Sequence, residues 1–245
     1  RLYDSFYPQF EHQASTTYKL GLYVWQGINM SPLDAGAVEI FGNDDKIMVA
    51  TNNGPAIKTY RYSGGANPDI DELASETYAL NASASLTAVT GVGLSHDSKV
   101  MALGSRGGTT YIYKFTSVTE PATFTFAGLD GAVSLAGHNT DSTISYFTNG
   151  NSLVQFRPVG SGLVKDSISS ANGTFGTLGR VRYARFTPSY ASQLFVADPT
   201  NNRIIRFTND VLANPSNVNA SSPVDMTPTN NRLLTLSTTN SQVSL

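Results

Sequence analysis

The sequence predicts an all-β protein, specifically a β-propeller, and three observations lead to this prediction. One pattern of short apolar strands and polar turns recurs five times along the 245 residues, and repetition on this scale is typical of propeller blades. Hardly any segment has the 3.6-residue apolar period of a helix. The chain also contains 12 Tyr and 12 Phe within a hydrophobic content of 40%, as folded β-rich proteins do. We therefore expect five blades, or six if residues 1–36 form a further, poorly repeated blade.

The second strand of each repeat is its most regular part. The five apolar runs are Lys46–Ala50, Lys99–Leu103, Thr143–Phe147, Gln193–Ala197 and Arg232–Leu236. Their opening apolar residues, Ile47, Val100, Ile144, Leu194 and Leu233, are 53, 44, 50 and 39 residues apart. This spacing of about 46 residues on average lies in the range of propeller blades.

The other strands are placed relative to these runs. Each run is followed by a turn rich in Asn, Gly, Ser and Thr, and Asn-Gly or Gly-Gly accepts the positive φ of a tight hairpin. Third strands are predicted at Ile57–Tyr62, Thr110–Phe115, Leu153–Arg157, Arg203–Phe207 and Gln242–Leu245. Innermost strands are predicted at Ala37–Phe41, Val89–Leu94, Ala132–Ala136, Val181–Phe186 and Val224–Met226. Outer strands are less regular, and Glu76–Leu80 and Thr123–Phe126 are the clearest.

We divide the chain into an N-terminal segment, residues 1–36, and the propeller repeats, residues 37–245, within a single domain. The fifth repeat runs out at Leu245 without a fourth strand. Tyr18–Trp25 is predicted to supply that strand and close the ring, which would remove exposed sheet edges. The chain begins at Arg1 without Met, so we expect it to be a piece of a longer protein.

Composition excludes several classes of function. Only 14% of residues are charged and the net charge is −2, so a basic surface for nucleic acid is not expected. The absence of cysteine excludes disulfides, zinc-thiolate sites and cysteine nucleophiles. No apolar stretch approaches the roughly 18 residues of a membrane helix, so the chain is not expected to be embedded in a membrane.

Basic residues are concentrated in the fourth repeat. They are Arg180, Arg182, Arg185, Arg203 and Arg206. We expect them to form cross-strand pairs and contacts at the rim with neighbours such as Asp198 and Asp210. The alternative is a local site for an acidic partner, such as a phosphorylated or carboxylated glycan.

No catalytic constellation is apparent. His96 and His138 lie near Asp97 and Asp141, but these aspartates recur at a turn position where Asp bonds its own backbone, so the histidines are interpreted as rim residues. Calcium is the predicted cofactor, because acidic residues cluster in two expected loops and oxygen ligands suit this ion; the alternative is that both are solvated polar loops without a metal. The candidate ligands are Asp69, Asp71 and Glu72 in one loop and Asp44 and Asp45 in the other.

Two repeats resemble known propeller families. The run Leu194-Phe195-Val196-Ala197-Asp198-Pro199-Thr200-Asn201-Asn202-Arg203-Ile204-Ile205-Arg206-Phe207 resembles the NHL-type repeat, and Leu94–Ser105 resembles a WD-type blade without its terminal Trp-Asp. Each resemblance covers one blade and implies the fold alone.

The whole chain, a cysteine-free and irregular propeller rich in Asn, Ser and Thr, also resembles the receptor-binding spike proteins of corticoviruses, the tailless, membrane-containing marine bacteriophages. That resemblance implies attachment of a virion to a Gram-negative host, bound calcium, a location on the virion surface and pentameric assembly of the full-length spike.

We therefore expect a non-enzymatic attachment head that binds a host cell-surface receptor, such as a glycan or lipopolysaccharide, through variable loops. One alternative is a metal-dependent propeller hydrolase of the lactonase kind. Those sites place a divalent metal on the axis with Glu, Asn and Asp from innermost strands, and the corresponding strands here offer Glu39 and Asp225. A second alternative is an intracellular scaffold propeller.

Overall fold

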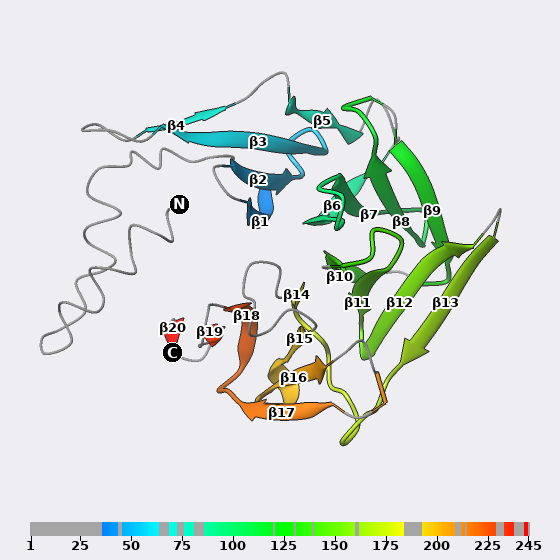
Figure 1. The fold of residues 1–245 in the computed structure, drawn as a ribbon, viewed down its shortest axis with the longest axis vertical. Coiled ribbons are helices and arrows are strands. Elements are labelled where there is room, and N and C mark those ends of the chain that lie inside the picture. The colour runs from blue at the N-terminus through cyan, green and yellow to red at the C-terminus, as the bar shows by residue number, and fades with distance from the viewer. Residues whose placement is uncertain are drawn as a thin grey trace, which may run out of the picture.

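The computed structural model is all-β, and its sheets surround a common axis as the blades of a propeller (Figure 1). It describes residues 36–43, 46–63, 69–72, 76–80, 86–119, 121–129, 131–138, 140–159, 162–183, 193–208, 212–213, 215–228, 233–237 and 243–244. Within these residues, four sheets have four or more strands and a fifth has three. The predicted fold class is thus confirmed. The predicted closing strand, Tyr18–Trp25, lies outside the described residues.

Each sheet is built from consecutive antiparallel strands, with the innermost strand first. Blade 1 contains β1 (Ala37–Asn43), β2 (Lys46–Thr51), β3 (Ala56–Ser63), β4 (Asp69–Glu72) and β5 (Tyr78–Ala79). Blade 2 contains β6 (Ala88–Leu94), β7 (Val100–Arg106), β8 (Thr109–Phe115) and β9 (Pro121–Ala127). Blade 3 contains β10 (Ala132–Gly137), β11 (Ser145–Asn149), β12 (Ser152–Val159) and β13 (Gly162–Ile168). Blade 4 contains β14 (Val181–Tyr183), β15 (Gln193–Asp198), the 3-10 turn η3 (Pro199–Asn201), β16 (Arg203–Thr208) and β17 (Ser216–Asn219). Blade 5 contains β18 (Pro223–Pro228), β19 (Leu233–Ser237) and β20 (Val243–Ser244).

The outer strands differ most from the prediction. Asp69–Glu72 forms the strand β4, paired with Tyr60–Ser63 of β3, where a loop was expected. The predicted strand at Glu76–Leu80 is reduced to β5, which pairs with the beginning of β3. β13 and β17 were not predicted, because most of their residues are exposed and lack a clear apolar alternation.

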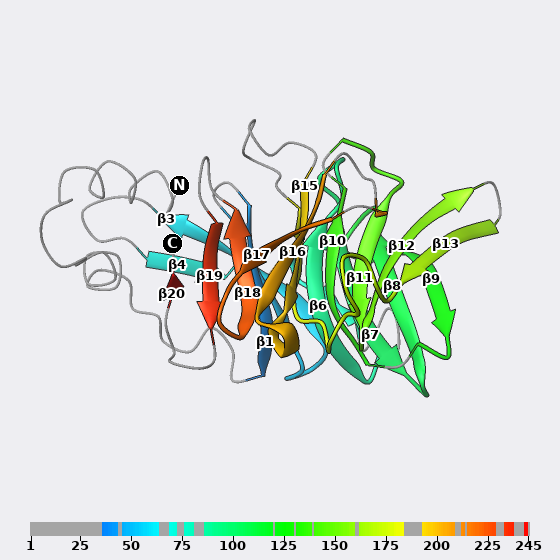
Figure 2. The ribbon, with the colours of Figure 1, turned by 90° about the horizontal axis from the view of Figure 1, so that it is seen from below.

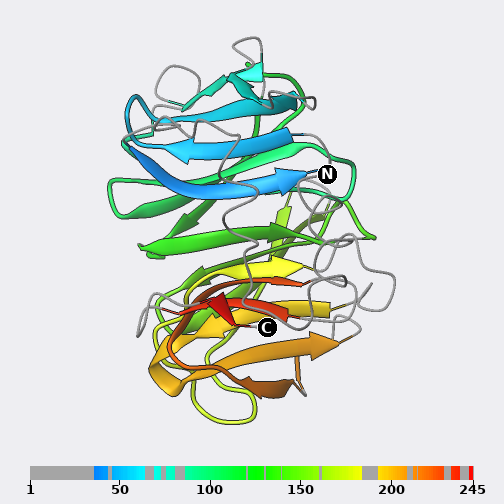
Figure 3. The same ribbon diagram turned by 90° about the vertical axis from the view of Figure 1, so that its left-hand side faces the viewer.

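Apolar side chains from adjacent blades interlock to form the core. Separate buried clusters join blade 1 to blade 2, blade 2 to blade 3, blade 3 to blade 4 and blade 4 to blade 5. Tyr113 and Phe115, which belong to the predicted third strand Thr110–Phe115, are buried in the first of these clusters. No such cluster joins blade 5 to blade 1 within the described part of the chain. Figure 3 looks at this side of the ring, with the first sheet in blue above and the last in red below.

A β-bulge recurs at the same place in four innermost strands. The register shifts between Ala37 and Glu39, between Val89 and Gly91, between Ala132 and Ser134, and between Pro223 and Asp225. A bulge leaves one residue out of the ladder, so the carbonyls of Val38, Thr90, Val133 and Val224 need partners elsewhere. Figure 2 shows the ring from its edge, with β12 and β13 at the end that lies away from β18 and β19. No helix in the described residues is long and apolar enough to cross a membrane.

Candidate functional site at the propeller axis

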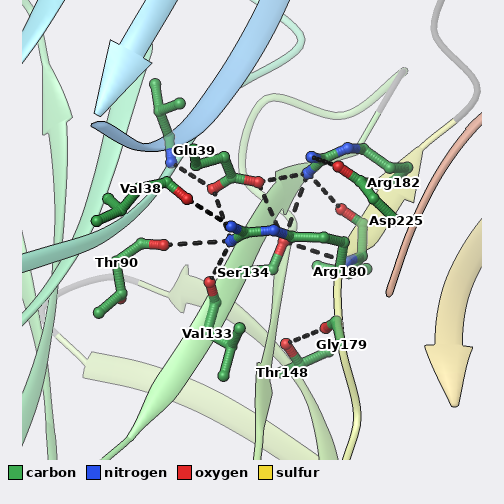
Figure 4. Close-up of polar contacts among 12 residues, drawn as sticks. Val38, Glu39, Thr90, Val133, Ser134, Thr148, Gly179, Arg180, Arg182 and Asp225 are labelled. Carbon is green, nitrogen blue, oxygen red and sulfur yellow. Dashed lines mark hydrogen bonds and ion pairs between the residues drawn. The ribbon is translucent and has the colours of Figure 1, made fainter. Parts of the chain in front are cut away.

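Arg180 provides partners for the bulge carbonyls. Its guanidinium donates hydrogen bonds to the carbonyl oxygens of Val38 at 2.6 Å, Val133 at 2.8 Å and Thr90 at 3.3 Å (Figure 4). The backbone N–H of Arg180 donates to the carbonyl of Val224 at 3.3 Å. One residue, immediately before β14, therefore binds the bulges of all four other blades.

Arg182 lies two residues further along the chain and binds carboxylates. In a strand, residues i and i+2 point to the same face, so the two arginines both reach the axis while Val181 between them is buried in the core. The guanidinium of Arg182 lies 2.6 Å from a carboxylate oxygen of Glu39 on β1 and 3.0 Å from one of Asp225 on β18. Arg182 therefore connects the first blade to the last.

The Glu39 carboxylate is fully enclosed. Its side chain has no exposed surface, and its second oxygen accepts the N–H of Val92 at 2.9 Å and lies 3.5 Å from Arg180. Gly91 makes room for it, because a Cβ at that position would lie 2.9 Å from the same oxygen. Ser134, which holds the equivalent post-bulge position in blade 3, contacts the other oxygen at 3.5 Å.

We call Glu39, Ser134, Arg180, Arg182 and Asp225 the axial centre. Its two guanidiniums and two carboxylates carry no net charge. Burial raises the pKa of Glu39, and the contacts with Arg182, Arg180 and the Val92 N–H limit that rise. Burial works to lower the pKa of Arg182, but Glu39 and Asp225 outweigh it and raise that pKa. A divalent ion does not suit this set of groups, because it would have to displace guanidiniums from both carboxylates.

A hollow of about 290 Å³ adjoins the axial centre. It is lined by Ala37, Val38, Glu39, Ile40, Arg180 and Asp225. The Ile40 side chain is largely exposed, and the side chain of Asp225 is 33% exposed. The hollow thus combines apolar wall, one accessible carboxylate and part of a guanidinium.

The prediction for the arginines was only partly correct. Arg203 does pair with Asp198 within blade 4, at 2.9 Å. Arg180 and Arg182 do not lie at the rim but at the axis, because the innermost strand of blade 4 carries them there. Glu39 and Asp225 were correctly placed on innermost strands, but their arginine partners were not foreseen. Arg185 and Asp210 lie outside the described residues.

A second arginine centre lies within blade 4. Arg203 donates to Asp198, whose side chain is fully buried, and to the carbonyls of Asn172 at 2.9 Å and Thr174 at 3.0 Å. Asp198 also accepts the backbone N–H of Gly176 and the side-chain amide of Asn201. We call this the blade 4 centre, because every partner belongs to blade 4 or to the segment that leads into it from β13.

His138 is not a rim residue, contrary to the sequence interpretation. It is buried, and its ring lies against Tyr146 and Tyr183. Nδ1 accepts the backbone N–H groups of Thr140 at 3.0 Å and Asp141 at 2.9 Å. His138 therefore organises the turn before β11 from inside the core, whereas His96 is exposed.

The two turn aspartates, Asp141 and Asp97, bind different kinds of partner. Asp141 accepts the N–H and hydroxyl of Thr143, as expected for this turn position, and these bonds lower its pKa. Asp97 instead contacts the side chains of Ser95, Lys99 and Lys114. Partial burial works to raise the pKa of Asp97, but the three side-chain contacts outweigh it and lower the pKa to about 2.

The predicted calcium ligands are not brought together as a loop. Asp69, Asp71 and Glu72 belong to β4, and an extended strand does not wrap its residues around one ion. Asp44 and Asp45 lie outside the described residues. Among the side chains that the structure does describe, no three His, Asp or Glu form a group that could bind a metal ion.

No family model matches the chain, and no curated protein matches it. Solved structures do match. The β-propeller domain of Myceliophteria thermophila Cps50 (Swd1) has a TM-score of 0.56 at 7% identity, over 83% of this chain and 63% of that one. A "putative 6-phosphogluconolactonase" from Bacteroides uniformis has a TM-score of 0.51 at 11% identity, over 81% and 62%. A functionally unknown protein from Desulfotomaculum acetoxidans has a TM-score of 0.52 at 14% identity, over 85% and 68%. At these identities the matches establish the propeller fold alone.

Proposed function

We propose that this chain is a non-enzymatic recognition propeller that binds a cell-surface glycan or lipopolysaccharide. One observation carries the proposal: both axial carboxylates are already paired with arginine. Glu39 is fully buried against Arg182 and Arg180, and Asp225 is paired with Arg182. The place where a propeller hydrolase of the lactonase kind would bind its metal is thus used for internal contacts.

The setting we propose is host attachment by a phage virion spike, and the resemblance to corticovirus spike proteins described above is what supports it. The groups that line the hollow beside the axial centre are of the kinds that bind sugars. The hollow beside the axial centre offers acceptor oxygens on Asp225 and donors on Arg180 next to the apolar side chain of Ile40. Sugars are bound by this combination of hydrogen-bonding groups and apolar surface.

The test compares binding with turnover. Purified protein is incubated with immobilised lipopolysaccharides and with envelope fractions of Gram-negative marine bacteria, and is separately assayed for lactone and ester hydrolysis with added Mg²⁺, Ca²⁺, Mn²⁺ or Zn²⁺. We expect saturable binding to at least one envelope fraction and no hydrolysis above the protein-free rate. Hydrolysis that requires a metal and is abolished by EDTA would overturn the proposal in favour of the lactonase alternative.

Calcium remains the cofactor that we propose, with Asp44 and Asp45 as its candidate ligands. A ligand that binds the folded state raises the melting temperature as its concentration increases. We expect Ca²⁺ but not Mg²⁺ at equal ionic strength to raise the melting temperature, and the paired variant Asp44→Asn with Asp45→Asn to abolish the rise. An equal response of the wild type to both ions, or none, would refute a calcium site.

A further inference from the structure

We infer that the ring is closed from the inside, by a latch of Glu39, Arg182 and Asp225 that couples blade 1 to blade 5 across the axis. This inference concerns how the scaffold is held together, and it does not depend on what the propeller binds. Its starting point is the pair of contacts that one arginine makes with these two blades. Four interfaces between successive blades contain buried apolar clusters, and the axial ion pairs provide a polar contact between blade 1 and blade 5.

Arg182 is the residue that bridges this junction. One nitrogen of its guanidinium contacts Glu39 of β1 at 2.6 Å and the other contacts Asp225 of β18 at 3.0 Å. The planar guanidinium is suited to this role, because it presents donors in fixed directions to two carboxylates at once. A lysine ammonium at the same position would offer one compact charge and could not span both carboxylates equally well.

Arg180 fixes the latch in place. Its bonds to the bulge carbonyls of blades 1, 2 and 3, and its N–H bond to Val224 of blade 5, hold the segment from Arg180 to Arg182 at the axis. Buried carbonyls that lose their donors are costly, at roughly 1–3 kcal/mol each. The segment therefore cannot leave the axis without exposing or orphaning groups on four blades.

The blade 4 centre provides a matched control. The side chains of Arg182 and Arg203 are equally buried, at 10% exposed, and each contacts a carboxylate with no exposed surface. Both substitutions to Met should therefore destabilise the protein. Only Arg182 joins separate blades, so only its loss should uncouple the first blade from the last.

Hydrogen exchange followed by mass spectrometry tests the latch. Wild type, Arg182→Met and Arg203→Met are compared under native conditions. We expect Arg182→Met to accelerate exchange about tenfold or more in both β1 and β18, while β7, β8 and β11 exchange as in the wild type. Arg203→Met should instead accelerate exchange in the segment 169–179 and around η3, and leave β1 and β18 unchanged.

A milder variant keeps the test informative if Arg182→Met does not fold. Arg182→Lys retains the charge and should accelerate exchange in β1 and β18 together, by less than the Met variant. Unchanged exchange in β1 and β18 of a folded Arg182 variant would overturn the inference. So would equal acceleration in those strands in Arg203→Met, because it would show a global loss of stability in place of a specific uncoupling.

Discussion

The axial centre and the blade 4 centre use the same pair of chemical groups over very different lengths of chain. Arg203 binds Asp198 across a tight turn, five residues away in sequence, whereas Arg182 binds Glu39 across 143 residues. A local pair forms together with its hairpin, but a pair between distant blades can form only when the ring is assembled. The comparison indicates that equal burial does not imply an equal role: one arginine shapes a blade, and the other joins blades.

Substitution of the buried carboxylates should give the largest difference in the free energy of unfolding between the two centres. Glu39→Gln leaves Arg182 and Arg180 near a neutral amide, and removing one partner of a buried ion pair costs about 3–5 kcal/mol. We expect Asp198→Asn to cost less, because Asp198 pairs with one guanidinium, and Arg203 keeps its bonds to the carbonyls of Asn172 and Thr174. Urea unfolding measures both free energies. A loss below about 1 kcal/mol for Glu39→Gln would contradict the assigned role of the axial centre.

The bulge backbone offers a test of intermediate size. Gly91→Ala brings a Cβ to 2.9 Å from the Glu39 carboxylate, and overpacking of this kind costs about 1–3 kcal/mol. Thr90→Val is the control, because it keeps the carbonyl that Arg180 binds and removes a buried hydroxyl without a partner in the described structure. We expect the control to be neutral or slightly stabilising in thermal unfolding. Equal destabilisation by the two variants would contradict the steric argument.

The smallest expected effect concerns an exposed cluster outside both centres. The pKa of Asp97 is lowered to about 2 in the folded protein, so its contribution to stability is present above its unfolded value and is lost as the pH falls towards 2. The side chain is 34% exposed, so after screening we expect about 1 kcal/mol or less. Asp97→Asn should lower stability at pH 6 and lower it by less at pH 2, where Asp97 of the folded protein is about half protonated. An equal loss at both pH values would show that ionisation of Asp97 is not the cause.

Much of the scaffold was predictable because its inner strands consist mainly of apolar residues. The second and third strands of every repeat lie within a few residues of their predicted positions. β13 was missed because its residues are mostly exposed, so burial imposes no apolar pattern on it.

Only the carboxylates of the candidate site were predictable from the sequence. Glu39 and Asp225 could be assigned to innermost strands, but their pairing with Arg182 depends on ring geometry that no local pattern encodes. In the structure, the position after each bulge is occupied by Glu39, Gly91, Ser134 and Asp225. A register shift of one residue changes which side chains face the axis, and the bulges were not evident from the sequence.

The repeated bulge has a consequence for how such a ring can change. Carbonyl oxygens converging from several blades resemble a crown ether, a macrocycle whose inward oxygens select a cation. Here the guest is the guanidinium of Arg180, tethered to the host by its own backbone. Because the Arg180 guanidinium is part of the chain, every molecule carries one, and dilution cannot remove it from the carbonyl oxygens. An unattached cation could occupy the same oxygens only after a substitution had first removed this side chain.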